Sequence, residues 1–106
     1  MPLEDPRNIR FVCDAHASRP NAHFTTLPVE WFIGKFVKLG FPAKTPDGGA
    51  STEHMWVKVL KLHDGDPPEE LVGELNNDPV YDVGYVCGDW VGFSRAEIEK
   101  VYGYHE

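Results

Sequence analysis

The chain of 106 residues is 42% hydrophobic and 25% charged, which indicates one soluble globular domain spanning residues 1–106. It carries 17 acidic and 10 basic residues, a formal net charge of −7, and this balance argues against binding a phosphate backbone. No apolar run approaches the roughly 20 residues that cross a bilayer, so the sequence excludes a membrane-spanning helix.

The first 28 residues give weak structural signals. Residues 1–7 contain two prolines and are expected to form a loose leader. Residues 9–13 mix β-branched and aromatic side chains, which favours a short strand. Residues 14–28 lack periodicity, so we expect a long surface connection there, with room for one turn of helix.

The next apolar segment is best divided at Gly34, because it is dense in aromatic and β-branched residues and interrupted by glycine. Residues 28–33 then form a short turn or helical corner, and residues 35–41 form a strand. Side chains of a strand alternate between its two faces. The residues that share the core face here are Val37, Leu39 and Phe41.

Two further strands are expected in the middle of the chain. Residues 42–52 contain Pro-Asp-Gly-Gly and suit a hairpin loop, which leads into a strand over residues 54–62. A turn over residues 64–68 leads into another strand over residues 70–76. The side chains expected to face the core are Met55, Val57, Val59, Leu71 and Leu75.

Near the C-terminus, a turn at Gly88 leads into a strand with Val91 and Phe93 facing inward. Ser94 and Glu97 have the spacing of a capping box over a single helical turn. Ile98 and Val101 are expected to anchor the end of the chain in the core. The fold we predict is mainly β, a small antiparallel SH3-like partial barrel of about five or six short strands with one short helical element. Its β core covers residues 34–104.

Four ordered blocks of the sequence resemble the YegJ-like family of bacterial domains, whose function is unknown. They are an E-H-M-W-V strand in residues 53–59, a G-x-L-x-N-x-P pattern in residues 73–80, a G-D-x-V-x-F strand in residues 88–93 and an E-I pair at 97–98. The order and spacing agree over residues 53–99, slightly under half of the chain. The resemblance implies a fold more than a function. Related small domains occur beside bacterial toxin systems, so it also implies an immunity-like role.

A polar and aromatic patch is the strongest candidate binding site. If the strands at 54–62 and 70–76 pair antiparallel, His54 lies near residues 76–78. An exposed tryptophan beside polar groups is typical of an interface anchor. The alternative is structural, with Asn76 and Asp78 satisfying backbone groups at a turn and Trp56 covering the edge of the core. The candidate residues are His54, Trp56, Glu74, Asn76, Asn77 and Asp78.

Cys13, His16 and His23 place three possible zinc ligands in one loop, and His54, His63 or Cys87 could complete the set. The spacing does not match a common zinc finger, so surface histidines and a small core cysteine are the simpler interpretation. We expect no cofactor and no catalytic residue. The four tyrosines could instead form an aromatic surface cluster that holds a peptide. They are Tyr81, Tyr85, Tyr102 and Tyr104.

Three classes of function remain open. The leading hypothesis is a non-enzymatic protein-binding module, with the immunity-like role that the resemblance implies, that uses the acidic second half of the chain against a basic protein partner. Residues 54–106 carry eleven acidic and four basic residues, hence all of the net charge. The second class is a small metal- or ligand-dependent enzyme that uses His54 or the loop of Cys13, His16 and His23. The third is a nucleic-acid-binding barrel, which the charge disfavours. Two cysteines and no recognisable export signal predict a cytoplasmic protein.

Overall fold

The computed structural model describes residues 10–11, 22–63, 70–81 and 83–104. These residues form one open six-stranded sheet in the order β1-β5-β4-β3-β2-β6. Neighbouring strands run antiparallel, except that β1 pairs with β5 in parallel. The strands are β1 (Arg10–Phe11), β2 (Phe36–Lys44), β3 (Ala50–Leu62), β4 (Leu71–Leu75), β5 (Trp90–Phe93) and β6 (Lys100–Val101). The mainly β prediction is therefore confirmed.

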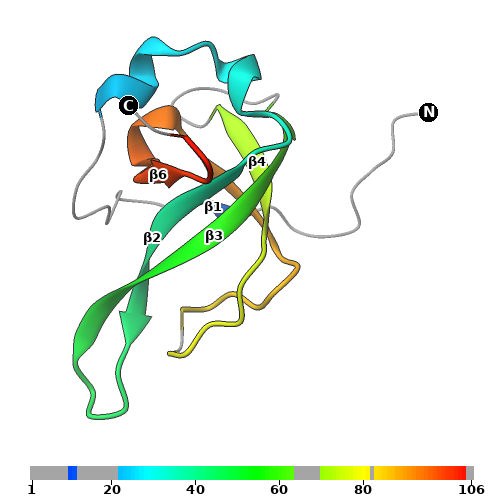
Figure 1. Cartoon of the computed structure of the whole chain (residues 1–106). Coiled ribbons are helices and arrows are strands. Elements are labelled where there is room, and N and C mark those ends of the chain that lie inside the picture. The colour runs from blue at the N-terminus through cyan, green and yellow to red at the C-terminus, as the bar shows by residue number, and fades with distance from the viewer. Residues whose placement is uncertain (1–9, 12–21, 64–69, 82, 105–106) are drawn as a thin grey trace.

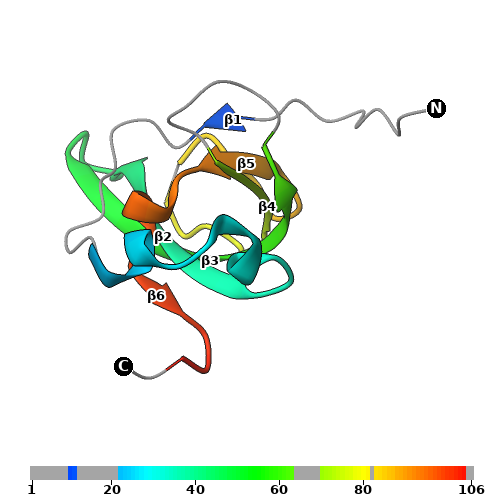
Figure 2. The same cartoon turned by 90° about the horizontal axis from the view of Figure 1, so that it is seen from above.

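Viewed from above, the sheet curls around its core but does not close (Figure 2), since β1 and β6 remain its two edges. The helical structure consists of short 3-10 segments, η1 (Ala22–Thr26), η2 (Val29–Phe32) and η3 (Arg95–Glu97). They gather at one end of the sheet, while the long β2–β3 hairpin extends from the other end (Figure 1). The expected single helical element is thus replaced by three 3-10 segments. No helix within the described residues is long and apolar enough to cross a membrane.

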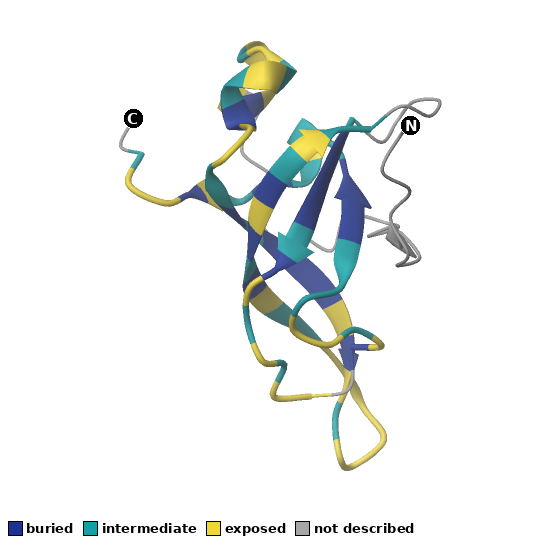
Figure 3. Cartoon of the chain, turned by 90° about the vertical axis from the view of Figure 1, so that its right-hand side faces the viewer, coloured by how far each residue is buried: buried dark blue, intermediate teal, exposed yellow. Residues whose placement is uncertain are grey.

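Buried and more exposed positions alternate along most of β2 and β3 (Figure 3), as the sequence pattern predicts, whereas β4 and β5 are buried almost throughout. Every side chain that we expected on the core faces of the strands is buried. The confirmed core residues are Val37, Leu39, Phe41, Met55, Val57, Val59, Leu71, Leu75, Val91 and Phe93. The division of the apolar segment at Gly34 is also confirmed, because this glycine has a φ of +86° between η2 and β2.

The C-terminal turn follows the predicted capping pattern. The carboxylate of Glu97 accepts the backbone N–H of Ser94 at 2.8 Å, which is the glutamate half of a capping box. Ile98 and Val101 are buried, as expected. The turn therefore fixes the point at which the chain leaves β5 and returns to pair with β2 as β6.

Two expectations need correction. The hairpin loop is shorter than the predicted 42–52, because β2 continues to Lys44 and β3 starts at Ala50. Proline has no N–H to donate to a neighbouring strand. Pro42 is tolerated within β2 because β6 pairs only with the start of β2, so no strand lies beside Pro42 on that edge. Phe24, in the expected surface connection, is buried and packs edge-on against Phe32. The leader at 1–7, residues 14–21 of the expected surface connection and the turn at 64–68 lie outside the described residues.

Candidate functional site

The predicted patch is only partly assembled by the structure. Trp56 lies beside the start of the segment that follows β4. The backbone carbonyl of Trp56 accepts the N–H of Asn76 at 2.9 Å. The side-chain oxygen of Asn77 accepts the N–H of Trp56 in turn. Asn77 therefore has a structural role, and it fixes the backbone at Trp56. Asp78 is exposed and does not line the cleft described below.

The His54 side chain contacts Glu99. Its Nδ1 lies 2.8 Å from Oε1 and 3.0 Å from Oε2 of this carboxylate. In the register of β2 and β3, His54 stands opposite Gly40, which has no side chain to separate the two groups. The antiparallel pairing of the strands at 54–62 and 70–76, on which the expected position of His54 depends, is confirmed. Glu99, just before β6, is a partner of His54 that the sequence did not suggest.

The main feature of the outer face of β2 and β3 is an aromatic cleft, which we name the Trp56 cleft. It is lined by Phe36, Trp56, Asn76 and Tyr102. Its volume is about 230 Å³. Trp56 and Tyr102 meet edge to face, with ring centroids 5.8 Å apart and an interplanar angle of 88°. The N–H of Tyr102 donates to the carbonyl of Phe36 at 2.9 Å, which places the two residues side by side. Tyr102 is 73% exposed, so the wall that it forms is open to solvent.

Sequence reasoning missed Phe36 and gave Tyr102 only as part of a tyrosine cluster. Phe36 could have been placed on the outer face, since Val37 beside it faces the core. The predicted cluster does not form. Tyr102 lines the Trp56 cleft, Tyr104 packs on Trp31, and Tyr81 and Tyr85 line a different cavity.

Lysines border the Trp56 cleft, although the chain as a whole is acidic. Lys38 lies directly opposite Trp56 on one side and opposite Lys100 on the other, so these three residues form one cross-strand row. The Nζ of Lys38 is 5.0 Å from the centroid of the Trp56 ring, a cation–π contact. In the next row, Lys58 lies opposite both Phe36 and Glu74. Glu74, from the predicted patch, thus faces a lysine across the strands.

Many of the carboxylates serve the fold itself. Glu53 accepts the N–H groups of Val80 at 2.7 Å and Tyr81 at 3.0 Å, and Asp89 accepts the N–H of Val86 at 2.9 Å. Both contacts fix the segment between β4 and β5. Among the described carboxylates that accept hydrogen bonds within the fold are those of Asp47, Glu53, Glu70, Asp89, Glu97 and Glu99. Net charge is therefore a poor guide to the charge beside Trp56.

A second cavity, of about 390 Å³, lies within the segment between β4 and β5. Its lining includes Pro79, Tyr81 and Val86. Val80 and Val86, both in this segment, expose most of their surface. The described residues around this cavity provide apolar contact area, and the carboxylates of Glu53 and Asp89 bind backbone N–H groups of this segment.

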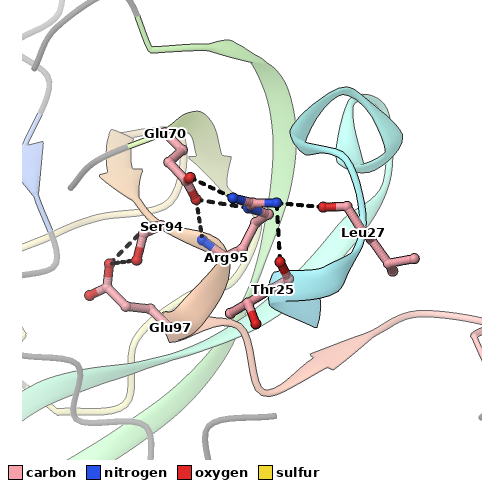
Figure 4. A network of polar contacts seen from close by, with 6 residues as sticks. All are labelled: Thr25, Leu27, Glu70, Ser94, Arg95 and Glu97. Atoms are coloured by element: carbon pink, nitrogen blue, oxygen red, sulfur yellow. Dashed lines mark hydrogen bonds and ion pairs between the residues drawn. The ribbon is translucent and has the colours of Figure 1, made fainter. Parts of the chain in front are cut away.

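Figure 4 shows a polar network that the sequence did not reveal. Glu70 binds the guanidinium of Arg95 with both oxygens, at 3.0 Å and 2.8 Å. Arg95 also donates to the carbonyls of Thr25 and Leu27, at 3.3 Å and 2.6 Å. The hydrogen bond from Arg95 holds the pKa of Glu70 below its ordinary value. The network joins η1 and η3 to the start of β4 and therefore stabilises the fold at the end remote from the hairpin.

The possible zinc loop is only partly within the described residues. Cys13 and His16 lie outside them. The Nε2 of His23 is 2.6 Å from the hydroxyl of Tyr104, and the two rings are stacked. Among the described residues, no group of three or more His, Cys, Asp or Glu side chains could hold a metal ion.

Comparison with known proteins identifies no relative of this chain. No family model matches the chain, and neither a curated protein nor a solved structure is significantly similar to it.

Proposed function

We propose that the chain is a non-enzymatic protein-binding module that holds a short extended segment of its partner in the Trp56 cleft. The observation that carries this proposal is an open edge-to-face pair, Trp56 and Tyr102, on the solvent side of a rigid sheet. Tryptophan and tyrosine are the residues that most often anchor protein interfaces, because they bury a large area with few rotatable bonds. Aromatic-lined grooves of this kind hold extended and proline-rich peptides in SH3 and WW domains.

The size of the cleft supports a peptide side chain as its occupant. Sites for cofactors and drug-sized ligands usually measure about 300–1,000 Å³. The Trp56 cleft measures about 230 Å³, which suits one or two side chains of an extended segment. Its wall is mostly aromatic, and its hydrogen-bonding groups are the amide of Asn76 and the polar tips of Trp56 and Tyr102. Apolar contact is therefore the main contribution that we expect from the cleft.

The same proposal includes two finer assignments, an SH3-like class for the curled sheet and membership of the YegJ-like family with an immunity-like role. The first is supported by the short antiparallel strands and the second by the blocks within residues 53–99. We also retain the cytoplasmic location, because Cys87 is an exposed free thiol and such thiols persist in reducing compartments.

A second candidate function is favoured by one contact. A histidine oriented by a carboxylate, as His54 is by Glu99, is the arrangement of a general base. An enzyme that uses His54, or the loop of Cys13, His16 and His23, thus remains the alternative. Stoichiometric zinc that is lost in the His16→Ala variant would favour this alternative.

The binding proposal can be tested by selecting random twelve-residue peptides, displayed on phage, against the immobilised chain. We expect a family of peptides enriched on the wild type and lost on the Trp56→Ala and Tyr102→Ala variants. Val86→Ala is the matched control, because it truncates an exposed apolar side chain outside the Trp56 cleft. Circular dichroism must show that all three variants are folded. The proposal is contradicted if no peptide is enriched, or if folded Trp56→Ala retains the peptides of the wild type.

A further inference from the structure

The charges around the Trp56 cleft have the opposite sign to the charge of the whole chain. The net charge is −7, yet the row that contains Trp56 continues through Lys38 to Lys100, with no carboxylate in it. Lys58 stands in the adjacent row, opposite Phe36. These ammonium groups lie on the same face as the cleft, because directly paired residues of antiparallel strands project to the same side.

Two carboxylates close to this face, those of Glu99 and Glu74, are already engaged or balanced. The side chain of Glu99 is only 10% exposed and binds His54. Glu74 lies across the strands from Lys58, so a positive group is its direct neighbour. In the cross-strand row of Trp56, the charged groups that a partner meets are those of Lys38 and Lys100.

The position of Lys38 also decides which charge a bound segment can carry. Trp56 and Tyr102 resemble two walls of an aromatic site for a cation. However, the ammonium of Lys38 already lies 5.0 Å from the Trp56 centroid and would repel a second cation. A carboxylate beside the ring would instead gain an ion pair with Lys38 while its chain covers Trp56.

We infer that the partner segment is acidic, with an apolar or proline residue seated between Trp56 and Tyr102 and carboxylates paired with Lys38, Lys58 and Lys100. This inference rests on the proposed function and specifies the chemistry of the partner. It differs from the basic partner that net charge alone predicts. Each exposed ion pair contributes little to affinity, so the acidic residues add mainly selectivity and on-rate to the apolar contact.

A single-stranded nucleic acid is also anionic, but the geometry favours a protein segment. Stacking platforms for bases present the faces of several rings along a groove. Here the edge of one ring packs against the face of the other, so the pair offers less stacking surface. The total charge of −7 also opposes a polyanion more strongly than a segment with a few carboxylates.

The experiment uses three display libraries of twelve-residue peptides that differ only at four fixed positions, occupied by Glu, Lys or Gln. We expect the Glu library to be enriched over the Gln library by roughly tenfold on the wild type, as a few exposed ion pairs would give. This preference should be lost on Lys38→Glu and kept on Lys44→Glu. The two variants change the net charge equally, and Lys44 lies at the far end of β2, paired with Ala50. Measurement at 50 mM and 300 mM salt should show the preference shrinking as salt rises.

The outcomes separate the inference from the function on which it rests. Preferential enrichment of the Lys library, or equal enrichment of all three on the wild type, overturns the acidic partner and leaves peptide binding intact. Failure of all three libraries overturns peptide binding itself. Tighter binding of a twelve-nucleotide oligothymidylate than of the best Glu peptide, abolished by Trp56→Ala, would replace the protein segment with a nucleic acid.

Discussion

Replacing Gly73 by alanine should destabilise the protein, because β4 approaches its neighbours too closely for a side chain at this position. A Cβ built on Gly73 would lie 2.4 Å from Cγ1 of Val57 and 2.8 Å from the carbonyl oxygen of Lys58. It would also lie 3.2 Å from Cε1 of Phe93. The contact with Val57 can be relieved by a change of rotamer, whereas the contact with Lys58 involves backbone and requires the strands to separate.

The expected magnitude follows from two opposing effects. Adding a methyl group to a tightly packed core costs about 1–3 kcal/mol. Replacing glycine within a strand restores about 0.5–1 kcal/mol, because the unfolded chain loses conformational freedom. We therefore expect Gly73→Ala to lower the free energy of unfolding by about 1–2 kcal/mol. For a domain of this size the midpoint of thermal unfolding should fall by about 4–15 °C.

Urea unfolding followed by circular dichroism measures this change directly. A double-mutant cycle with Val57→Ala identifies its cause, because removing Cγ1 of Val57 relieves one of the close contacts. The loss in the double variant should be smaller than the sum of the two single losses by about 0.5–2 kcal/mol. A Gly73→Ala variant as stable as the wild type, or two losses that simply add, would refute the packing argument.

Two further predictions concern carboxylates that bind within the fold. Glu70→Gln should lower the free energy of unfolding by about 1–2 kcal/mol at pH 7, because Arg95 loses its charged partner. The pKa of Glu70 is depressed in the folded protein, so this stabilisation is present above the ordinary glutamate pKa and is lost as the pH falls through the lower, folded value. Urea titrations at pH 7 and pH 3.5 should therefore show the gap between variant and wild type closing in acid, and an equal gap at both would rule out this linkage. Glu53→Gln should raise the hydrogen-exchange rates of the Val80 and Tyr81 amides by about tenfold. This factor corresponds to a loss of about 1.4 kcal/mol from the hydrogen bonds that these amides donate to the Glu53 carboxylate. Unchanged exchange at both amides would show that Glu53 does not fix the segment.

The sheet could be predicted because its signals are local. Alternation placed Val57 and Leu75 in the core, and Ser94 with Glu97 marked the last turn. Phe24 could not be predicted in the same way, because a single aromatic residue in an irregular segment has no periodicity to place it. Its burial depends on η1 lying against η3, a contact between segments about 70 residues apart.

The candidate site was less predictable, since it depends on which strands are neighbours. Trp56 could be identified from its position on the outer face of a clear strand. Tyr102 meets it only because β6 returns to pair with β2, and a two-residue strand has no sequence signature. The same pairing brings Lys100 beside Lys38 and Glu99 to His54. Net charge, a property of the whole sequence, could not reveal the lysines that gather around Trp56.

The most direct test of the central claim is a titration of the isotope-labelled chain with the most enriched displayed peptide, followed through backbone amide chemical shifts. Binding in the Trp56 cleft predicts that the largest shifts occur at Phe36, Trp56 and Tyr102, with little change at Val80 and Val86. The largest shifts at Val80 and Val86, with Trp56 unaffected, would place binding in the segment between β4 and β5 and contradict the account.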